Sequence, residues 1–144
     1  MLFGESGGTI VLSASEQEQQ PVMMAPIEEG GFYTARSISS QLENWVEISR
    51  FGHAGNLDPK FADQGLRKIV LEGGICDVEV KKDSSLFLCG YVQRGRNRDV
   101  WIMHILKNGK TDPEFGIQGV VTLTIREQDV AQHIVPLEDG GVLI

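Results

Sequence analysis

The chain has 144 residues, of which 41% are apolar and 23% are charged, and its 20 acidic and 13 basic residues give a net charge of −7. Because nucleic acids and anionic membranes attract basic surfaces, this balance argues against a general binder of nucleic acid or of a membrane surface. Two cysteines are too few for a disulfide scaffold or an all-cysteine zinc cluster, and no apolar run approaches the ~18 residues of a membrane span.

The length predicts a single domain over residues 1–144, large enough to fold without a metal ion or a disulfide. The N-terminus, MLFGESGGTIVL, has neither the basic region nor the long apolar region of a secretory signal. The localisation therefore stays open, with the cytoplasm as the default.

The chain repeats itself at a period typical of β-sheet repeat proteins. Three segments begin with Phe, have Gly four residues later and continue with an apolar run; they are FGESGGTIVL from Phe3, FADQGLRKIVL from Phe61 and FGIQGVVTLTI from Phe115. Their first residues lie 58 and 54 residues apart. We divide the domain into repeat units 3–60 and 61–114 and a partial unit 115–144.

Several residues recur at fixed places in these units. Asp58 and Asp112 each precede a Pro, and Gly65 and Gly119 follow seven residues later. An Asp before Pro commonly closes its own turn by accepting hydrogen bonds from nearby backbone N–H groups. We therefore expect both aspartates to be structural, since a catalytic pair would have to converge on one cleft. The Phe of each unit is expected to anchor the core.

The apolar runs along the chain predict strands. Residues 32–51 have apolar positions at helical spacing, but their second half matches a strand-like run in the next unit, so we expect strand there. Residues 77–80 alternate between apolar and polar, and three short β-prone runs follow at 101–106, 119–125 and 130–135. Four pairs between apolar runs suit two-residue hairpin turns; they are Glu29-Gly30, Asp83-Ser84, Asn108-Gly109 and Asp139-Gly140.

Each unit of about 55 residues therefore holds four strands joined by tight turns. This pattern predicts an all-β fold of four-stranded antiparallel blades of the β-propeller type, with two full repeats and a partial third. Each blade would bury its faces against its neighbours. An open stack resembling a β-solenoid is the alternative.

The segments Leu57–Gly65 (LDPKFADQG) and Thr111–Gly119 (TDPEFGIQG) give the chain a resemblance to the bacterial delta-60 repeat family. The hairpin parts are KDSSLFLCG from Lys82 and EDGGVLI from Glu138, and the likeness covers nearly the whole chain. The sequence departs from the pattern where Ala62 and Ser84 replace glycines. The resemblance implies a β-propeller-like arrangement, commonly in large and often exported bacterial proteins, and no established catalytic site.

Two full units and a partial one cannot close a ring, because propellers have at least about four blades. Open blades leave apolar faces and strand edges uncovered. We expect the chain to associate, either as a homo-oligomer or with neighbouring repeats of a longer protein; a partial stack that stands alone is the third possibility.

The stretch Arg94-Gly95-Arg96-Asn97-Arg98 is unusual in so acidic a chain. We expect it on a loop between the third and fourth strands of the complete blade. Three guanidinium groups there could bind a phosphate, sulfate or carboxylate. The alternative is a solvated loop whose charge protects a sheet edge from aggregation.

Cys76 and Cys89 flank the turn at Asp83-Ser84. A two-residue turn would make them diagonal neighbours on one face, at about 7–8 Å, which is awkward for a disulfide. We expect two reduced thiols that pack as small apolar groups, with a redox pair or a metal site as the alternative.

No catalytic, metal or cofactor motif emerges from the sequence. The three histidines are isolated, and neither a G-x-S-x-G elbow, a P-loop nor a dinucleotide fingerprint occurs. The sequence thus favours a non-catalytic repeat module that serves as a protein interaction or assembly surface. The alternative is a ligand-binding, glycan-binding or enzymatic propeller whose site forms only in the complete assembly.

Overall fold

The computed structural model describes residues 22–144, which form ten β-strands and no helix. The strands are β1 (Met23–Pro26), β2 (Phe32–Ser39), β3 (Asn44–Phe51), β4 (Leu66–Val70), β5 (Gly73–Val80), β6 (Leu86–Arg94), β7 (Asn97–Ile105), β8 (Val120–Leu123), β9 (Val135–Pro136) and β10 (Val142–Leu143). Accordingly, this part of the chain holds no helix that could cross a bilayer. The all-β prediction is confirmed.

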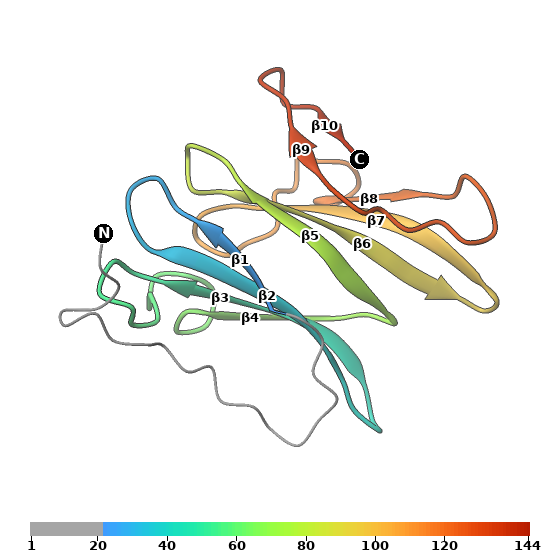
Figure 1. The fold of residues 1–144 in the computed structure, drawn as a ribbon, viewed down its shortest axis with the longest axis horizontal. Helices are drawn as coiled ribbons and strands as arrows, with labels where there is room; N and C mark the ends of the chain where they lie inside the picture. The colour runs from blue at the N-terminus through green and yellow to red at the C-terminus, as the bar shows by residue number, and fades with distance from the viewer. Residues whose placement is uncertain (1–21) are drawn as a thin grey trace.

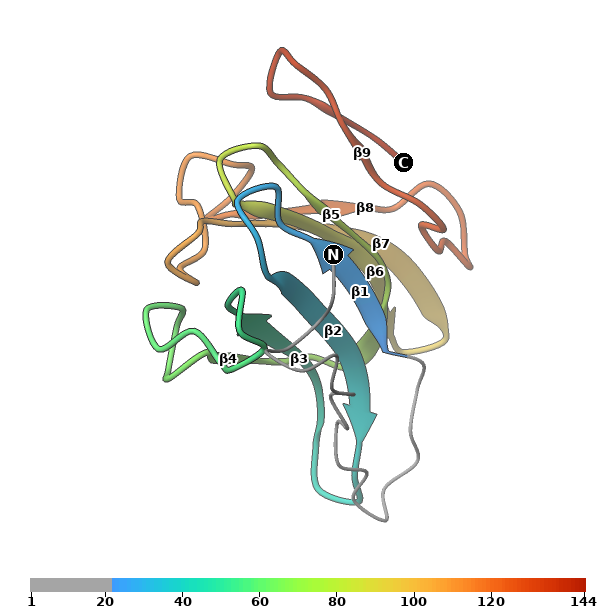
Figure 2. The same cartoon turned by 60° about the vertical axis from the view of Figure 1, so that its left-hand side comes forward.

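The strands form two four-stranded antiparallel sheets and one short hairpin. Sheet 1 has the order β1-β2-β3-β4, sheet 2 has the order β5-β6-β7-β8, and the C-terminal hairpin pairs β9 with β10. In Figure 1 sheet 2 lies between sheet 1 and the hairpin, and Figure 2 shows the same three layers after a rotation. The prediction of four-stranded antiparallel sheets is confirmed for both.

The sheets do not coincide with the sequence units. β4 belongs to sheet 1 although it follows Phe61, and β8 belongs to sheet 2 although it follows Phe115. Each sheet therefore takes its fourth strand from the sequence unit that begins after its third strand. The segment that begins at Phe3 lies outside the described residues.

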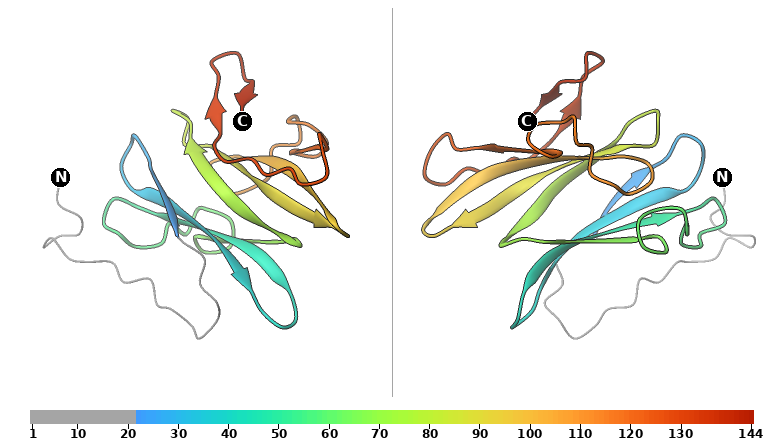
Figure 3. Two further views of the ribbon diagram at one scale, coloured as in Figure 1. Left: turned by 45° about the vertical axis from the view of Figure 1, so that its right-hand side comes forward. Right: turned by 180° about the vertical axis from the view of Figure 1, so that it is seen from behind.

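Two apolar cores lie between the three layers, and Figure 3 shows these layers from two further sides. The first core lies between sheet 1 and sheet 2; its buried side chains are Ala25, Ile27, Tyr33, Ala35, Val46, Ile48, Phe61, Ile75, Val78, Leu86, Leu88, Trp101, Met103 and Ile105. The second core lies between sheet 2 and the C-terminal segment; its buried side chains are Phe87, Cys89, Val100, Ile102, Ala131 and Ile134. Sheet 2 is thus apolar on both faces.

The same type of hairpin loop occurs five times within residues 22–144, and it differs from the turns predicted from the sequence. In each, the first residue donates its N–H to the carbonyl four residues on, and the fourth residue, at positive φ, donates to the carbonyl of the first. The loops are 27–31, 52–56, 81–85, 106–110 and 137–141. Three loop residues ending in the left-handed region make a different hairpin from the predicted two-residue turns, although the four turn sites themselves are right.

The loop length shifts the register of the β5–β6 hairpin. Val80 pairs with Leu86, Asp77 pairs with Cys89, and Cys76 sits unpaired in a β-bulge between Ile75 and Asp77. The two-residue turn predicted at Asp83-Ser84 would instead pair Cys89 with Val78, so the predicted register of this hairpin is wrong by one residue. Ser84 stands at φ +64° where the other four loops have Gly, which explains why the sequence pattern expected Gly there.

Two predicted strands also change. Residues 32–51 form two strands, because Ser40 accepts hydrogen bonds from the N–H groups of Leu42 and Glu43 and closes a turn between them. Within residues 130–135 only Val135 belongs to a strand. Ala131 and Ile134 are buried there as expected of an apolar run, but the N–H of Ile134 donates to Asp77 Oδ2 at 3.0 Å and not to a neighbouring strand.

Candidate functional site: a repeated network and a cleft between the sheets

A network of rings and charges occurs in sheet 1, at the end near the β1–β2 loop. Tyr33 on β2 meets the edge of Phe61 with centroids 5.3 Å apart, and the Arg50 guanidinium on β3 lies 5.5 Å from the Tyr33 ring centre. Arg50 Nε lies 3.3 Å from the Asp58 carboxylate. Tyr33 also donates its hydroxyl hydrogen to the carbonyl of Ser84 in the β5–β6 loop at 2.8 Å, and burial raises the pKa of this phenol to about 12.

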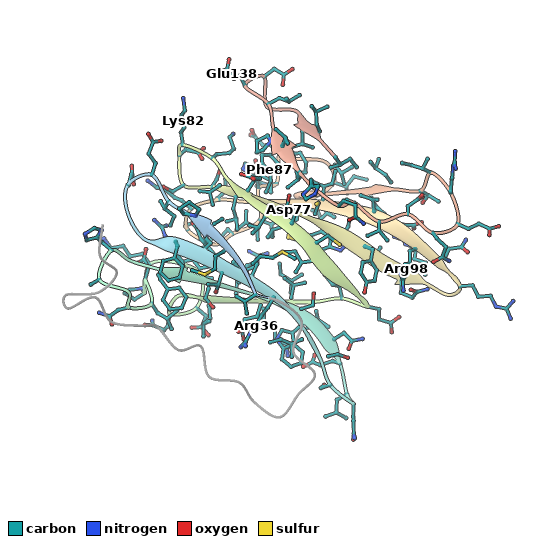
Figure 4. The ribbon with its side chains drawn as sticks, viewed as in Figure 1. Arg36, Asp77, Lys82, Phe87, Arg98 and Glu138 are labelled. Carbon is teal, nitrogen blue, oxygen red and sulfur yellow. The ribbon has the colours of Figure 1, made fainter. Side chains whose placement is uncertain are left out.

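The same network recurs 54 residues later with different residues. Phe87 takes the place of Tyr33 and stacks on His104 with centroids 4.2 Å apart, while Phe115 meets the edge of Phe87 at 5.2 Å. His104 Nδ1 lies 2.8 Å from Asp112 Oδ2. Asp58 and Asp112 therefore each contact a polar side chain of the preceding strand, Arg50 or His104; Phe87 of the second copy is labelled in Figure 4.

The two aspartates also close their own turns, as the sequence predicts. Asp58 Oδ1 accepts the N–H of Lys60 and Asp112 Oδ1 accepts the N–H of Glu114, both at 3.0 Å. Asp58 lies in the β3–β4 connection of sheet 1 and Asp112 in the β7–β8 connection of sheet 2, so the two do not converge. Phe61 is fully buried and Phe115 is partly buried, and the backbone N–H of each donates to the carbonyl of its own Asp.

The second network brings together a serine, a histidine and an aspartate, which sequence reasoning missed. His104 Nε2 lies 3.0 Å from Ser85 Oγ, while Ser85 donates its hydroxyl hydrogen to Asp83 at 2.6 Å. Because a hydroxyl has one hydrogen, this bond leaves the seryl oxygen as an acceptor toward His104 and not as a nucleophile activated by it. Ser85 is only 2% exposed, so the cluster has the character of a buried structural network.

The hydrogen bonds of this network should make the stability fall in acid. The Glu114 N–H and then His104 lower the pKa of Asp112; at Asp83 burial acts to raise the pKa, but the hydrogen bonds from Ser85 outweigh it and the net shift is downward. A depressed carboxyl pKa contributes stability above the unfolded value of about 4, and this is lost as the pH falls through the folded pKa.

We expect the free energy of unfolding, measured by urea denaturation between pH 6 and pH 3, to fall below about pH 4. The slope of the free energy of unfolding against pH should be shallower for Asp112→Asn than for the wild type. Glu138→Gln, which changes an exposed carboxylate of the β9–β10 loop, should keep the wild-type slope. Equal slopes for Asp112→Asn and wild type would contradict this role of Asp112.

The structure does not bring the three arginines of residues 94–98 together. Arg94 and Arg98 lie within β6 and β7, the second and third strands of sheet 2, and only Gly95 and Arg96 form the turn. Arg94 pairs with Asn97 and Arg98 with Gln93, so their side chains leave opposite faces of the sheet. Arg94 Nε lies 3.0 Å from the nearly buried carboxylate of Asp99, while Arg96 is exposed. A single anion site shared by all three guanidinium groups therefore has no support in this geometry.

The cysteines are free thiols, and Cys89 is fully buried in the second core. Burial raises the pKa of Cys89 to about 12 and, with help from Asp77, also raises that of the half-buried Cys76. Both thiols therefore lack the lowered pKa of a reactive cysteine. Among residues 22–144, no group of three or more potential ligands from His, Cys, Asp and Glu is arranged to hold a metal ion.

A cleft of about 370 Å³ lies between the two sheets, where β2 ends and β5 begins. Its walls include Ser37 on β2, Asn44 on β3, Tyr91 on β6 and Arg98 on β7, and Glu72 stands in the β4–β5 connection. The backbone of Gly73 and Gly74 also lines it. Of the predicted anion-binding residues, Arg98 is the one that the cleft contains.

Comparison of the sequence with protein-family models and with characterised proteins finds no match. The resemblance to delta-60 repeats thus rests on the residues of this chain and stays a prediction.

Proposed function

We propose that the chain is a non-catalytic β-propeller-type repeat module that serves for assembly, its sheets acting as blades that pack on further sheets of the same kind. The observation that carries this proposal is sheet 2, whose two faces are both apolar and both covered. A sheet with this composition needs a neighbour on each side, since each uncovered apolar side chain forgoes roughly 1.5–3 kcal/mol of burial.

The two ends of the stack expose apolar side chains that a further neighbour would cover. On sheet 1, Met24 is 60% exposed and Val70 is 62% exposed, both on the face away from sheet 2. On the C-terminal hairpin, Val135 and Leu143 are 52% and 59% exposed. These two residues pair with each other on the side opposite Val142, which packs into the second core.

A contact between these two ends would be head-to-tail, because sheet 1 and the hairpin are different surfaces. Such heterologous contacts close into a ring or continue as a filament, depending on the rotation between neighbours. Both outcomes give a sheet stack longer than one chain. The proposed partner is therefore a second copy of this chain or a neighbouring repeat of the same architecture.

The test is sedimentation equilibrium of the purified chain over a wide range of concentration. We expect reversible association, and we expect Val135→Lys and Leu143→Lys each to weaken it about tenfold or more, because each removes an apolar contact and introduces a charge. The matched control is Leu42→Lys, at a 96% exposed position in the β2–β3 turn of sheet 1, outside the C-terminal hairpin.

A chain that stays monomeric at millimolar concentration would overturn the proposal. So would association that the hairpin variants and the Leu42→Lys control weaken to the same extent, because the contact would then not involve the hairpin.

A further inference from the structure

The cleft between the sheets contains a positively charged group, Arg98, that has no ionic partner among residues 22–144. The Arg98 guanidinium lies 4.7 Å from the centre of the Tyr91 ring, and its Nε donates to Gln93 Oε1 at 3.2 Å. The Gln93 amide donates in turn to the carbonyls of Gly95 and Asn97. Within residues 22–144 no carboxylate lies within ion-pair distance of Arg98, and its two terminal nitrogens have no hydrogen-bond partner there.

This arrangement holds the guanidinium in place before any ligand arrives. The ring of Tyr91 covers one face of the group, and Gln93 fixes the direction of its Nε–H. The free edge carries parallel N–H groups that match the two oxygens of a carboxylate. Because the side chain is half-buried, binding there would order few additional rotamers.

Two further hydrogen-bond donors stand in the cleft walls. Asn44 uses its Oδ1 to accept the hydroxyl hydrogen of Ser39 at 2.6 Å, which leaves its NH₂ group for another partner. Ser37 Oγ accepts the N–H of Ile75 at 2.9 Å, which leaves its own hydrogen to donate. Gly74 keeps this wall open, since a Cβ there would lie 3.1 Å from the Tyr91 ring and 3.2 Å from Ser37 Oγ.

The opposite charge in the cleft narrows the class of ligand. Glu72 is exposed and lines the same cleft, so it would repel a dianion such as sulfate or phosphate. A monocarboxylate that also carries an ammonium or hydroxyl group could bind both charged residues of the cleft. Its carboxylate would pair with Arg98, and its ammonium or hydroxyl group could donate a hydrogen bond to Glu72. The volume of about 370 Å³ is in the range of small-molecule sites.

We propose that this cleft binds a small organic monocarboxylate that carries additional hydrogen-bond donors, with the carboxylate on the Arg98 guanidinium. An amino acid and a hexuronic acid share this chemistry. The inference goes beyond the proposed assembly function and does not depend on it, because one chain supplies the whole cleft; Arg98 is labelled in Figure 4.

The test is a titration of the ¹⁵N-labelled full chain with alanine, glucuronate, glucose and sulfate at constant ionic strength, followed by NMR. Alanine or glucuronate should shift the amide signals of Gly73, Gly74 and Arg98 in a saturable manner, whereas glucose and sulfate should not. Glu72→Gln distinguishes an amino acid from a hexuronic acid as the ligand. It should weaken the binding of alanine, because the ammonium group of alanine pairs with the Glu72 carboxylate. It should leave the affinity for glucuronate unchanged or raise it.

Arg98→Gln should weaken binding about tenfold or more, as expected for the loss of a bidentate charged pair. Arg98→Lys, which keeps the charge but lacks the planar fork, should weaken it several-fold. The matched control is Arg94→Gln, in the same hairpin but on the opposite face, and it should bind like wild type. The spectrum of each unliganded variant reports whether it is folded.

Three results would overturn the proposal: no saturable shift with either carboxylate, equal binding by wild type and both Arg98 variants, or sulfate binding as tight as that of the carboxylates.

Discussion

Replacing Phe61 with alanine should lower the free energy of unfolding by about 3–5 kcal/mol, the usual cost of removing a fully buried phenyl ring. Phe61 is 0% exposed in the first core and meets the edge of Tyr33, so its removal leaves a cavity between sheet 1 and the loop before β4. Urea denaturation followed by circular dichroism measures the change, provided that the slope of the transition is unchanged.

The repeat supplies a matched control at Phe115. This ring holds the equivalent place beside Phe87 but is only partly buried, because the second core is covered by a short hairpin and not by a complete sheet. Phe115→Ala should therefore cost less than Phe61→Ala. If both substitutions lowered the free energy of unfolding equally, the layer that covers each Phe would not determine how much that Phe stabilises the fold.

Replacing Gly119 with alanine should cost about 2–5 kcal/mol, which combines backbone strain with steric overlap. Gly119 has φ +86°, and a Cβ there would lie 2.0 Å from Thr111 Cγ2 and 2.6 Å from the carbonyl oxygen of Asp112. The side chain would thus push β8 away from the Asp-Pro turn that the repeat places beneath it. The same urea titration measures the loss.

Gly140→Ala measures the cost of the backbone strain alone, without steric overlap of the added Cβ. Gly140 has φ +90°, and a Cβ added there would meet no other atom within 4 Å, so alanine should cost only about 1–2 kcal/mol. A loss at Gly140 as large as that at Gly119 would show that the backbone conformation alone explains the repeated glycine.

The register of the β5–β6 hairpin shows where local reasoning stops. Asp83 and Ser84 are recognisable as turn residues because both tolerate turn conformations. Two-residue and three-residue hairpins accept the same residue types, however, and the choice between them moves every cross-strand pair by one. The sequence therefore located the turn but not the partners of Cys89.

Arg94, Arg98 and His104 show that closeness in the sequence does not predict which side chains meet in the folded chain. Arg94 and Arg98 look like one cluster because they are close in sequence, yet strand alternation sends them to opposite faces. His104 and Asp112 look unrelated at a separation of eight residues, but the return of the chain after β7 places them 2.8 Å apart. The signal that could have linked them was the repeat itself, which aligns this pair with Arg50 and Asp58.

By itself the sequence determined the all-β class, the presence of four-stranded antiparallel sheets and the places of four hairpin turns, because strand alternation and turn chemistry act over a few residues. Only the tertiary structure decided which sheet each strand joins, which layer covers each face, and that Arg98 shares a cleft with Glu72. These features depend on burial between segments far apart in the chain, and short-range patterns carry no information about which apolar faces meet.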